Sequence, residues 1–333
     1  MIFDKYVVFL PQTDVYINTY FELFNKKNVE VIDSILDLDS ELLRKMHRVH
    51  YSYKLNQVIN VPFKNLWYPI YYRNEKTKEK ILFLFVGTEE RCLSKYTRSY
   101  RNYLKNKFPN CIIALFFTDL VELRRSFDIN RIKIFADIII DYDKVEAKKF
   151  GFLYHTDVIT KLDVGVNTSD EFENYVNFCG IQKNRGELIL QIYRKLTSWG
   201  INVDFSVPDC SVGTVDENNT LKDLGYIPYT EYLKRLKKSK CILEIMQENA
   251  VGYTLRTIEA IQYNKLLISN NEELKNFEFY NPQYMKIIKN SEDIDLNWLI
   301  STKNVKYDYE NQLTPFKLLE YISKQVMRND DYK

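Results

Sequence analysis

Short apolar runs alternate with amphipathic segments along the first half of the chain. The runs with the length and composition of buried strands are residues 5–10, 81–86, 111–117 and 135–141. Segments in which apolar residues recur at helical spacing cover residues 14–26, 39–56, 89–107 and 143–150. This alternation predicts an α/β layer.

The same alternation starts again, more densely, after the polar segment KLDVGVNTSDEFE (residues 161–173). From NYVNFCG to KLLIS, strands and helices follow one another as in a βαβ series. We therefore predict an α/β fold with two Rossmann-like domains facing a cleft, residues 1–172 and 173–314, that binds its ligand where strands end. The tail, residues 315–333, holds an amphipathic helix that we expect to return to the first domain.

Composition excludes several classes of protein. The chain has 333 residues, 45% of them hydrophobic, which is enough for a large core and excludes a mainly disordered protein. Its 47 basic and 45 acidic residues leave a net charge of +2, so no overall electrostatic footprint for nucleic acid exists. Nine glycines, none at the spacing of a dinucleotide fingerprint or a P-loop, exclude those two phosphate-binding devices.

The cysteines and the amino terminus indicate a compartment. Five scattered cysteines without a CxxC pair predict neither a disulfide framework nor a zinc ribbon, and they suit a reducing environment. The first apolar run is too short for a signal peptide and follows the acidic Asp4. No apolar run reaches the ~18 residues of a membrane span. We expect a cytoplasmic protein, soluble or peripheral to the inner face of the membrane.

One stretch, CILEIMQENAVGYTLRTIEAIQYNKLLISNN (residues 241–271), is more specific than the rest. A strand ends in a polar loop that contains Gly252, a helix begins near Tyr253 or Thr254, and Glu259 lies inside it. This stretch resembles the sugar-nucleotide-binding domain of bacterial capsular polysaccharide and lipopolysaccharide glycosyltransferases with the GT-B fold. The resemblance covers roughly residues 173–285 and implies a two-domain, metal-independent glycosyltransferase.

The residue types in this stretch suit a nucleotide. A carboxylate such as that of Glu259 can accept both ribose hydroxyls, and free N–H groups at a helix start suit a diphosphate. Arg256 either reaches a phosphate or pairs with Glu259 on the helix surface. The GT-B pattern has a second glutamate earlier, but Val251 occupies that position here. Sugar recognition is then left to residues 247–249, which equally suit a plain loop.

Two further segments are candidates for donor binding. In GIQKNRG (residues 180–186), Lys183 and Arg185 lie beside a helix start, where they can neutralise a diphosphate leaving group or simply solvate a turn. In GYIPY (residues 225–229), Ile227 and Tyr229 flank a turn whose backbone can bind a base edge, although ordinary turn chemistry explains it equally well.

An inverting enzyme needs a base from the first domain. Three residues follow strands there: Asp14, Glu89 and His155. Each has a structural alternative, because Asp14 can cap a helix, Glu89 suits a helix dipole and His155 can be a core residue.

Other signals compete with this interpretation. Asp141 and Asp143 form a DxD, which either holds a metal and a donor diphosphate in a GT-A enzyme or caps a helix together with Glu146. His47 and His50 are a metal pair by spacing, but a solvated helix face is favoured. The basic and aromatic segment 91–105 suits an anionic lipid, a lipid-linked pyrophosphate acceptor, a nucleic acid or no ligand at all.

Together these observations predict a glycosyltransferase that moves a sugar from a nucleotide-sugar to a surface-polysaccharide acceptor. We expect UDP as the nucleotide, a lipid-linked oligosaccharide as the acceptor, no separate cofactor, no metal and no nucleic-acid partner. Peripheral membrane contact is expected through residues 91–105. The alternatives are a GT-A enzyme that uses Asp141 and Asp143, and a non-catalytic protein of the same fold that holds an anionic polymer.

Overall fold

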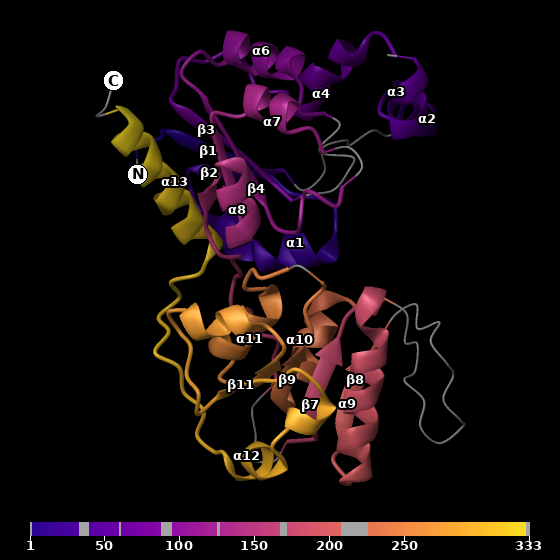
Figure 1. Cartoon of the computed structure of the whole chain (residues 1–333). Coiled ribbons are helices and arrows are strands. Elements are labelled where there is room, and N and C mark those ends of the chain that lie inside the picture. The colour runs from indigo at the N-terminus through magenta and orange to yellow at the C-terminus, as the bar shows by residue number, and fades with distance from the viewer. Residues whose placement is uncertain are drawn as a thin grey trace. The chain divides into compact units, whose positions relative to one another are not determined.

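The computed structural model describes residues 2–32, 40–59, 61–87, 95–124, 127–166, 172–207, 226–248 and 250–330. It divides into unit 1, Met1–Thr156 with Thr314–Lys333, and unit 2, Asp157–Leu313 (Figure 1). The division lies nearer the amino terminus than the predicted boundary at residue 172. The reason is that the segment after Asp157 packs on unit 2, where the Gln262 side chain donates to the carbonyl of Ile159 at 3.2 Å.

Unit 1 is built on a six-stranded sheet in the order β2-β1-β3-β4-β5-β6, with every neighbouring pair parallel. The strands are β1 (Lys5–Phe9), β2 (Val29–Ile32), β3 (Ile81–Val86), β4 (Ile112–Phe117), β5 (Ile138–Asp141) and β6 (Leu153–Tyr154). The near-continuous apolar composition of β3 and β4 suits strands that are covered on both faces.

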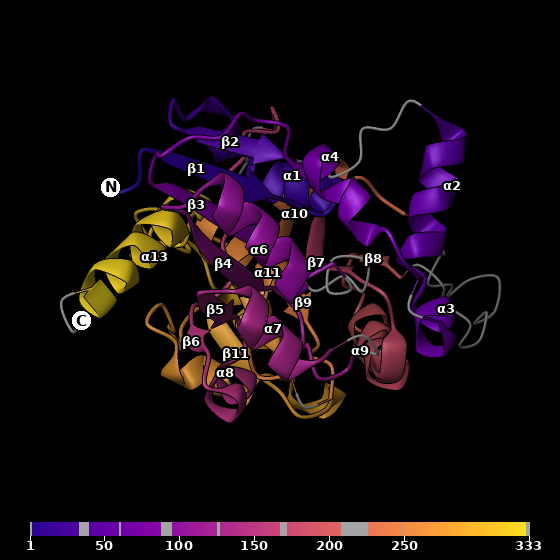
Figure 2. The ribbon, with the colours of Figure 1, turned by 90° about the horizontal axis from the view of Figure 1, so that it is seen from above.

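Helices lie on both faces of this sheet. The helices of unit 1 are α1 (Asp14–Thr19), α2 (Glu41–His50), α3 (Tyr53–Val58), α4 (Tyr68–Tyr71), α6 (Arg98–Lys107), α7 (Ile129–Phe135), α8 (Lys144–Phe150) and α13 (Pro315–Asp330). Of these, α2 and α3 lie at the periphery of the sheet (Figure 1 and Figure 2). Val7 and Phe9 belong to a core that includes residues of α6 and α7, which lie side by side in Figure 2. Tyr6 points the other way and bonds Ser323 of α13 at 3.0 Å. The predicted return of the last helix to the first domain is confirmed.

Unit 2 has a five-stranded parallel sheet in the order β11-β10-β9-β7-β8. Its strands are β7 (Asn174–Cys179), β8 (Val203–Ser206), β9 (Ser239–Glu244), β10 (Leu266–Ser269) and β11 (Met285–Ile287). Its helices are α9 (Gly186–Ser198), α10 (Tyr229–Lys237), α11 (Leu255–Gln262) and α12 (Leu296–Ser301). Short 3₁₀ turns complete the two units, at Phe21–Asn25, Lys64–Trp67, Lys183–Arg185, Glu272–Asn276 and Ser291–Asp293.

The predicted α/β class with two parallel-sheet domains is confirmed. The sequence pattern misses β2, β11 and α7, since each is only three to seven residues long and gives little periodicity. Among the described helices, none combines the length and apolar composition needed to cross a membrane.

Candidate functional site

The carboxyl edge of the unit 2 sheet gathers most of the predicted donor-site residues. Helices that follow parallel strands run back across the sheet, so α10 and α11 both begin at this edge. Thr254 caps α11 by accepting a hydrogen bond from the Arg256 N–H at 3.1 Å. The edge therefore presents a helix start beside the loop that follows β9.

Glu244, the last residue of β9, fixes that helix start. Its buried carboxylate accepts hydrogen bonds from the hydroxyls of Thr254, Thr257 at 2.9 Å and Ser269 at 2.6 Å. These donors come from α11 and from the end of β10, so one carboxylate joins three elements. The sequence analysis missed Glu244, although an acid directly after the apolar residues Cys241–Leu243 was a signal for it.

The loop between β9 and α11 is also held from the β10 side. Asn270 accepts from the Met246 N–H at 2.6 Å, and Asn271 donates to the Gly252 carbonyl at 3.2 Å. The Tyr253 hydroxyl donates to the carbonyl of Glu273 at 3.1 Å. The predicted site residues Gly252, Tyr253 and Thr254 are thus positioned by a network of short polar contacts.

Two guanidinium groups lie against the turn that follows β7. Arg256 donates to the Cys179 carbonyl at 2.7 Å, and Arg185 donates to the carbonyls of Ile181 at 3.0 Å and Ile245. Gly180 leaves room for this arrangement, because a Cβ there would stand 3.3 Å from Arg185 Nη2. Two positive charges therefore meet at the carboxyl edge beside the start of α11.

Glu259 lies in the core between α10 and α11. It is 0% exposed, and its oxygens accept hydrogen bonds from the hydroxyls of Tyr229 at 2.9 Å and Tyr232 at 2.6 Å. Arg256 Nη1 stands 3.9 Å from Glu259 Oε2. Burial raises the pKa of Glu259, while Arg256 and the two hydroxyls oppose that rise. The structure thus gives Glu259 a role in joining two helices, which the sequence did not suggest.

The same contacts place the predicted base-binding segment beside Glu259. Tyr229 is the first residue of α10 and is buried, and Ile227 is half-buried just before it. Tyr232 packs its ring against the Arg256 guanidinium, with 5.0 Å from Cζ to the ring centroid. The predicted binders of base, ribose and phosphate therefore form one connected cluster, which runs from Tyr229 through Glu259 and Arg256 to the turn beside Arg185.

Two charged side chains face solvent next to this cluster. Lys183 is exposed in a left-handed backbone conformation, with φ of 45°. Glu248 is exposed in the loop after β9 and accepts from the Asn184 amide at 3.2 Å. Gln247 is half-buried beside it, and Asn249 lies outside the described residues.

The predicted bases of unit 1 lie far apart. Asp14 is half-buried at the start of α1 and accepts from the Asn18 amide at 2.8 Å. His155 follows β6 and donates from Nδ1 to the Thr156 carbonyl at 2.7 Å, which leaves Nε2 as the nitrogen that can take a proton. Four strand spacings separate β1 from β6, about 19 Å, so these two residues cannot share a substrate hydroxyl. Glu89 lies outside the described residues.

One residue of the DxD, Asp143, is a helix cap. Asp143 caps α8 by accepting from the N–H groups of Val145 at 2.8 Å and Glu146 at 3.1 Å. Asp141 is fully buried, and burial raises its pKa to about 8. The alternative of a GT-A enzyme built on these two residues is not favoured, because the chain forms two parallel-sheet units.

The described part of the segment 91–105 has packing and ion-pair roles. Residues 91–94 lie outside the described residues. Tyr96 and Tyr100 are buried in the core of unit 1. Arg101 and Lys105 both bind the carboxylate of Asp137, at 2.6 and 2.8 Å, so they tie α6 to the segment between α7 and β5.

The histidine pair in α2 also has a packing role. His47 is buried and its Nε2 lies 2.8 Å from the Tyr71 hydroxyl. His50 Nδ1 accepts from Trp67 Nε1 at 2.6 Å. The favoured expectation of a solvated face is wrong for both side chains. Within the described ranges no group of three or more His, Cys, Asp or Glu side chains is arranged to hold a metal.

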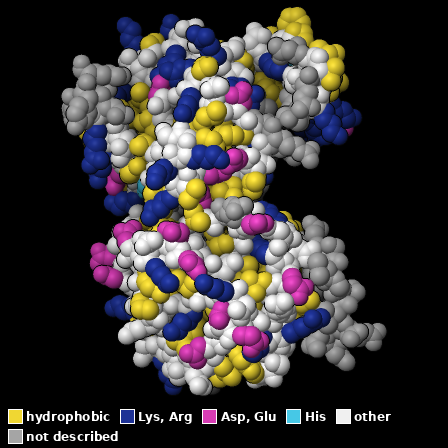
Figure 3. All heavy atoms as spheres, in the orientation of Figure 1, with side chains coloured by type: hydrophobic (Ala, Val, Ile, Leu, Met, Phe, Trp, Pro, Cys, Tyr) yellow, Lys and Arg dark blue, Asp and Glu magenta, His cyan; other side chains and the backbone are white. Residues whose placement is uncertain are grey.

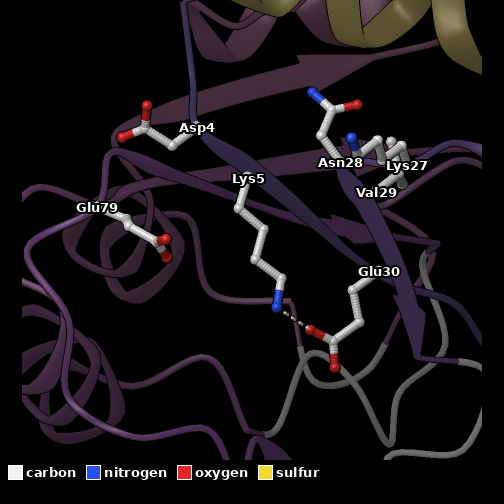
Figure 4. Close-up of a pocket in the computed structure, with 7 residues that line it drawn as sticks. All are labelled: Asp4, Lys5, Lys27, Asn28, Val29, Glu30 and Glu79. Carbon is white, nitrogen blue, oxygen red and sulfur yellow. Dashed lines mark ion pairs between the residues drawn. The ribbon is translucent and has the colours of Figure 1, made fainter.

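A cavity of about 770 Å³ lies where strands β1 and β2 of the unit 1 sheet begin, at the amino-terminal edge of the sheet (Figure 4). Its lining comes from the amino ends of β1 and β2, where Lys5 and Glu30 form an ion pair at 2.6 Å. Ligands of parallel sheets bind at the carboxyl ends of strands, so this cavity is not the substrate site.

Comparisons with solved structures identify the architecture. A structure described as a putative UDP-N-acetylglucosamine 2-epimerase from Listeria monocytogenes aligns with a TM-score of 0.52 at 10% identity, over 99% of this chain and 97% of that one. A second UDP-N-acetylglucosamine 2-epimerase structure aligns at 0.51 and 11% identity, with the same coverage. The chain has the GT-B fold.

Other comparisons add less. An α1,3-fucosyltransferase structure aligns at a TM-score of 0.46 and 15% identity, over 98% of this chain and 90% of that one, which is too weak to carry an argument. No family model and no curated protein matches the sequence. At identities this low, the likenesses show the fold alone.

Proposed function

We propose that this chain is a glycosyltransferase that transfers a sugar from a nucleotide-sugar to a surface-polysaccharide acceptor. The observation that carries the proposal is the connected cluster at the carboxyl edge of unit 2. Two guanidinium groups and a helix start provide positive potential for a diphosphate, and Ile227, directly before α10, is the described candidate for contact with a base. UDP is the nucleotide that the family resemblance favours.

The same groups suit the departure of the nucleoside diphosphate. Negative charge develops on the diphosphate as the bond to the sugar breaks, and Lys183, Arg185 and Arg256 stabilise that charge without a metal ion. Burial alone would lower the pKa of Arg256, but the neighbouring Tyr232 and Glu259 more than offset this, so its guanidinium stays charged. The acceptor hydroxyl would lose its proton to Asp14, Glu89 or His155 of unit 1.

Two carboxylates compete for the ribose. Glu259 is the one implied by the family resemblance, but it would have to exchange two tyrosine hydroxyls for those of the ribose. Glu248 is exposed already and lies beside the turn that carries Lys183. The ratio of affinities for UDP and 2′,3′-dideoxy-UDP tests the assignment, because that ratio falls toward one only when the true ribose ligand is changed to Gln.

Turnover tests the proposal itself. The full chain is incubated with UDP-sugars and a lipid-linked oligosaccharide acceptor, with and without EDTA, and released UDP and elongated acceptor are quantified. Elongation that survives EDTA is expected. Since the same fold serves UDP-N-acetylglucosamine 2-epimerases, a parallel reaction without acceptor is run in D₂O. If deuterium appears at C2 of the sugar and the acceptor is not elongated under any condition, the proposal is wrong and the chain is an epimerase.

A further inference from the structure

Residues 42–66 of unit 1 concentrate exposed apolar side chains. Eight of the eighteen large apolar side chains that are exposed in the described part of the chain lie here, and we call them the α2–α3 patch: Leu42, Leu43, Met46, Val49, Val58, Ile59, Phe63 and Leu66. α2 and α3 lie at the periphery of unit 1, away from its strands (Figure 1 and Figure 2). Figure 3 shows apolar side chains gathered over this region at the upper right, with Lys and Arg side chains below them.

The patch is not the face by which α2 packs on unit 1. That contact is made by His47 and His50, whose rings meet Trp67 edge-on, with centroid distances of 5.0 and 5.6 Å. The Tyr71 hydroxyl completes it through His47. α2 is therefore anchored by aromatic and hydrogen-bonded contacts that leave its aliphatic side chains out of the core.

The aliphatic side chains of α2 form a separate face. Leu42, Met46 and Val49 follow the i, i+4, i+7 spacing of one helix stripe and are 67%, 44% and 51% exposed. A stripe of this kind faces the core in an ordinary surface helix. Here the stripe faces solvent, and an exposed apolar surface of this kind marks a site that binds a protein or a membrane.

Positive charge lies beside the apolar stripe. By helical spacing Lys45 flanks the stripe, Arg48 lies farther round α2 and Arg44 lies on the side away from the stripe; all three are exposed, and Lys45 Nζ pairs with Glu41 at 2.9 Å. Across the described residues between 40 and 66 there are five basic side chains and one acidic one, Glu41, whereas the whole chain carries a net charge of only +2. The segment that carries the patch is therefore much more basic than the rest of the chain.

The patch also contains an exposed aromatic residue with a strained backbone, Phe63, which directly precedes the 3₁₀ turn Lys64–Trp67. Phe63 has a φ of 63°, in the left-handed region that a bulky side chain rarely adopts, and its side chain is 67% exposed. Backbone strain of this kind persists where a residue serves a function, and here it holds an aromatic ring out in solvent.

We propose that the α2–α3 patch docks unit 1 onto a membrane surface that contains anionic lipid. An apolar stripe on one face and Lys and Arg side chains on the polar side is the pattern of a helix that lies in the lipid interface. A second copy of the chain suits this surface less well, because it would bring the basic side chains around the patch against their own like charges. The inference concerns binding alone and does not require that the chain be a glycosyltransferase.

Vesicle flotation of the full chain tests the proposal. Phosphatidylcholine vesicles with and without phosphatidylglycerol are compared at low and high salt. The variant Leu42→Ser/Met46→Ser/Val49→Ser removes the stripe, Arg44→Gln/Arg48→Gln removes charge, and Leu123→Ser is the matched control, since Leu123 is 67% exposed elsewhere on unit 1. All these positions are exposed, and unchanged melting temperatures verify that the variants fold.

The wild type and Leu123→Ser should float with the anionic vesicles, and the bound fraction should fall as salt rises. The stripe variant should partition at least about tenfold less, and the charge variant should lose the preference for phosphatidylglycerol. No flotation with either vesicle overturns the proposal. A dimer in sedimentation velocity that the stripe variant abolishes, without any vesicle binding, overturns it in favour of a second copy.

Discussion

Replacing Glu259 by alanine should destabilise unit 2, because the carboxylate joins α10 to α11. The change removes the acceptor of two buried hydroxyls, at 2.9 Å from Tyr229 and 2.6 Å from Tyr232. A hydrogen bond to a charged group contributes about 1.5–3 kcal/mol, so the two together amount to about 3–6 kcal/mol. That is a large part of the about 5–15 kcal/mol that stabilises a typical domain.

Differential scanning calorimetry measures the effect directly. For a unit of this size each kcal/mol lowers the melting temperature by about 2–4 °C, so Glu259→Ala should lower it by on the order of 10 °C. Glu259→Gln is the matched control. Its amide still accepts from one tyrosine and donates to the other, so its melting temperature should lie much closer to that of the wild type. An alanine variant that melts within about 2 °C of the wild type would refute the joining role.

Three further predictions concern charge and catalysis. Lys183→Ala should weaken UDP binding much more than uridine binding in titration calorimetry, because its partner is the phosphate pair, and equal losses would contradict that role. Asp141 holds its proton up to about pH 8 in the folded chain, so its contribution to stability is complete below pH ~4 and is lost as pH rises through about 8. Asp141→Asn should therefore raise the melting temperature at pH 8.5 and leave it unchanged at pH 4, and a gain at pH 4 alone would argue against a buried neutral acid. Of Asp14→Asn and His155→Gln, the variant that removes the base should lower turnover by about 10²–10⁴ with donor affinity intact, and two active variants would exclude both residues.

The fold could be predicted from the sequence to the extent that its elements are periodic. The buried strands β3 and β4 are continuous apolar runs between polar loops, and α9 and α13 carry clear helical spacing. The exact division between the units could not be predicted. The polar composition of residues 161–173 marks a linker, whereas the contact of Ile159 with Gln262 that decides the division is tertiary.

In the candidate site, too, the sequence predicts individual residues but not their tertiary contacts. Gly252, Arg256 and Glu259 stand out by their spacing, and the structure brings Arg256 and Glu259 together. Their actual partners do not follow from spacing, because Tyr229, Tyr232 and Cys179 reach them from other elements. Arg101 and Lys105 show the reverse case, in which a basic pattern proves to be a pair of contacts to one carboxylate, that of Asp137.

Titration calorimetry of the full chain with UDP, GDP, CMP and dTDP tests the central claim most directly. A nucleoside diphosphate, UDP by expectation, should bind the wild type with a 1:1 stoichiometry. Its affinity should fall by at least about tenfold in Lys183→Ala, which alters an exposed side chain and leaves the core untouched. The absence of heat with all four nucleotides, or an affinity that Lys183→Ala leaves unchanged, would contradict a donor site at the carboxyl edge of unit 2.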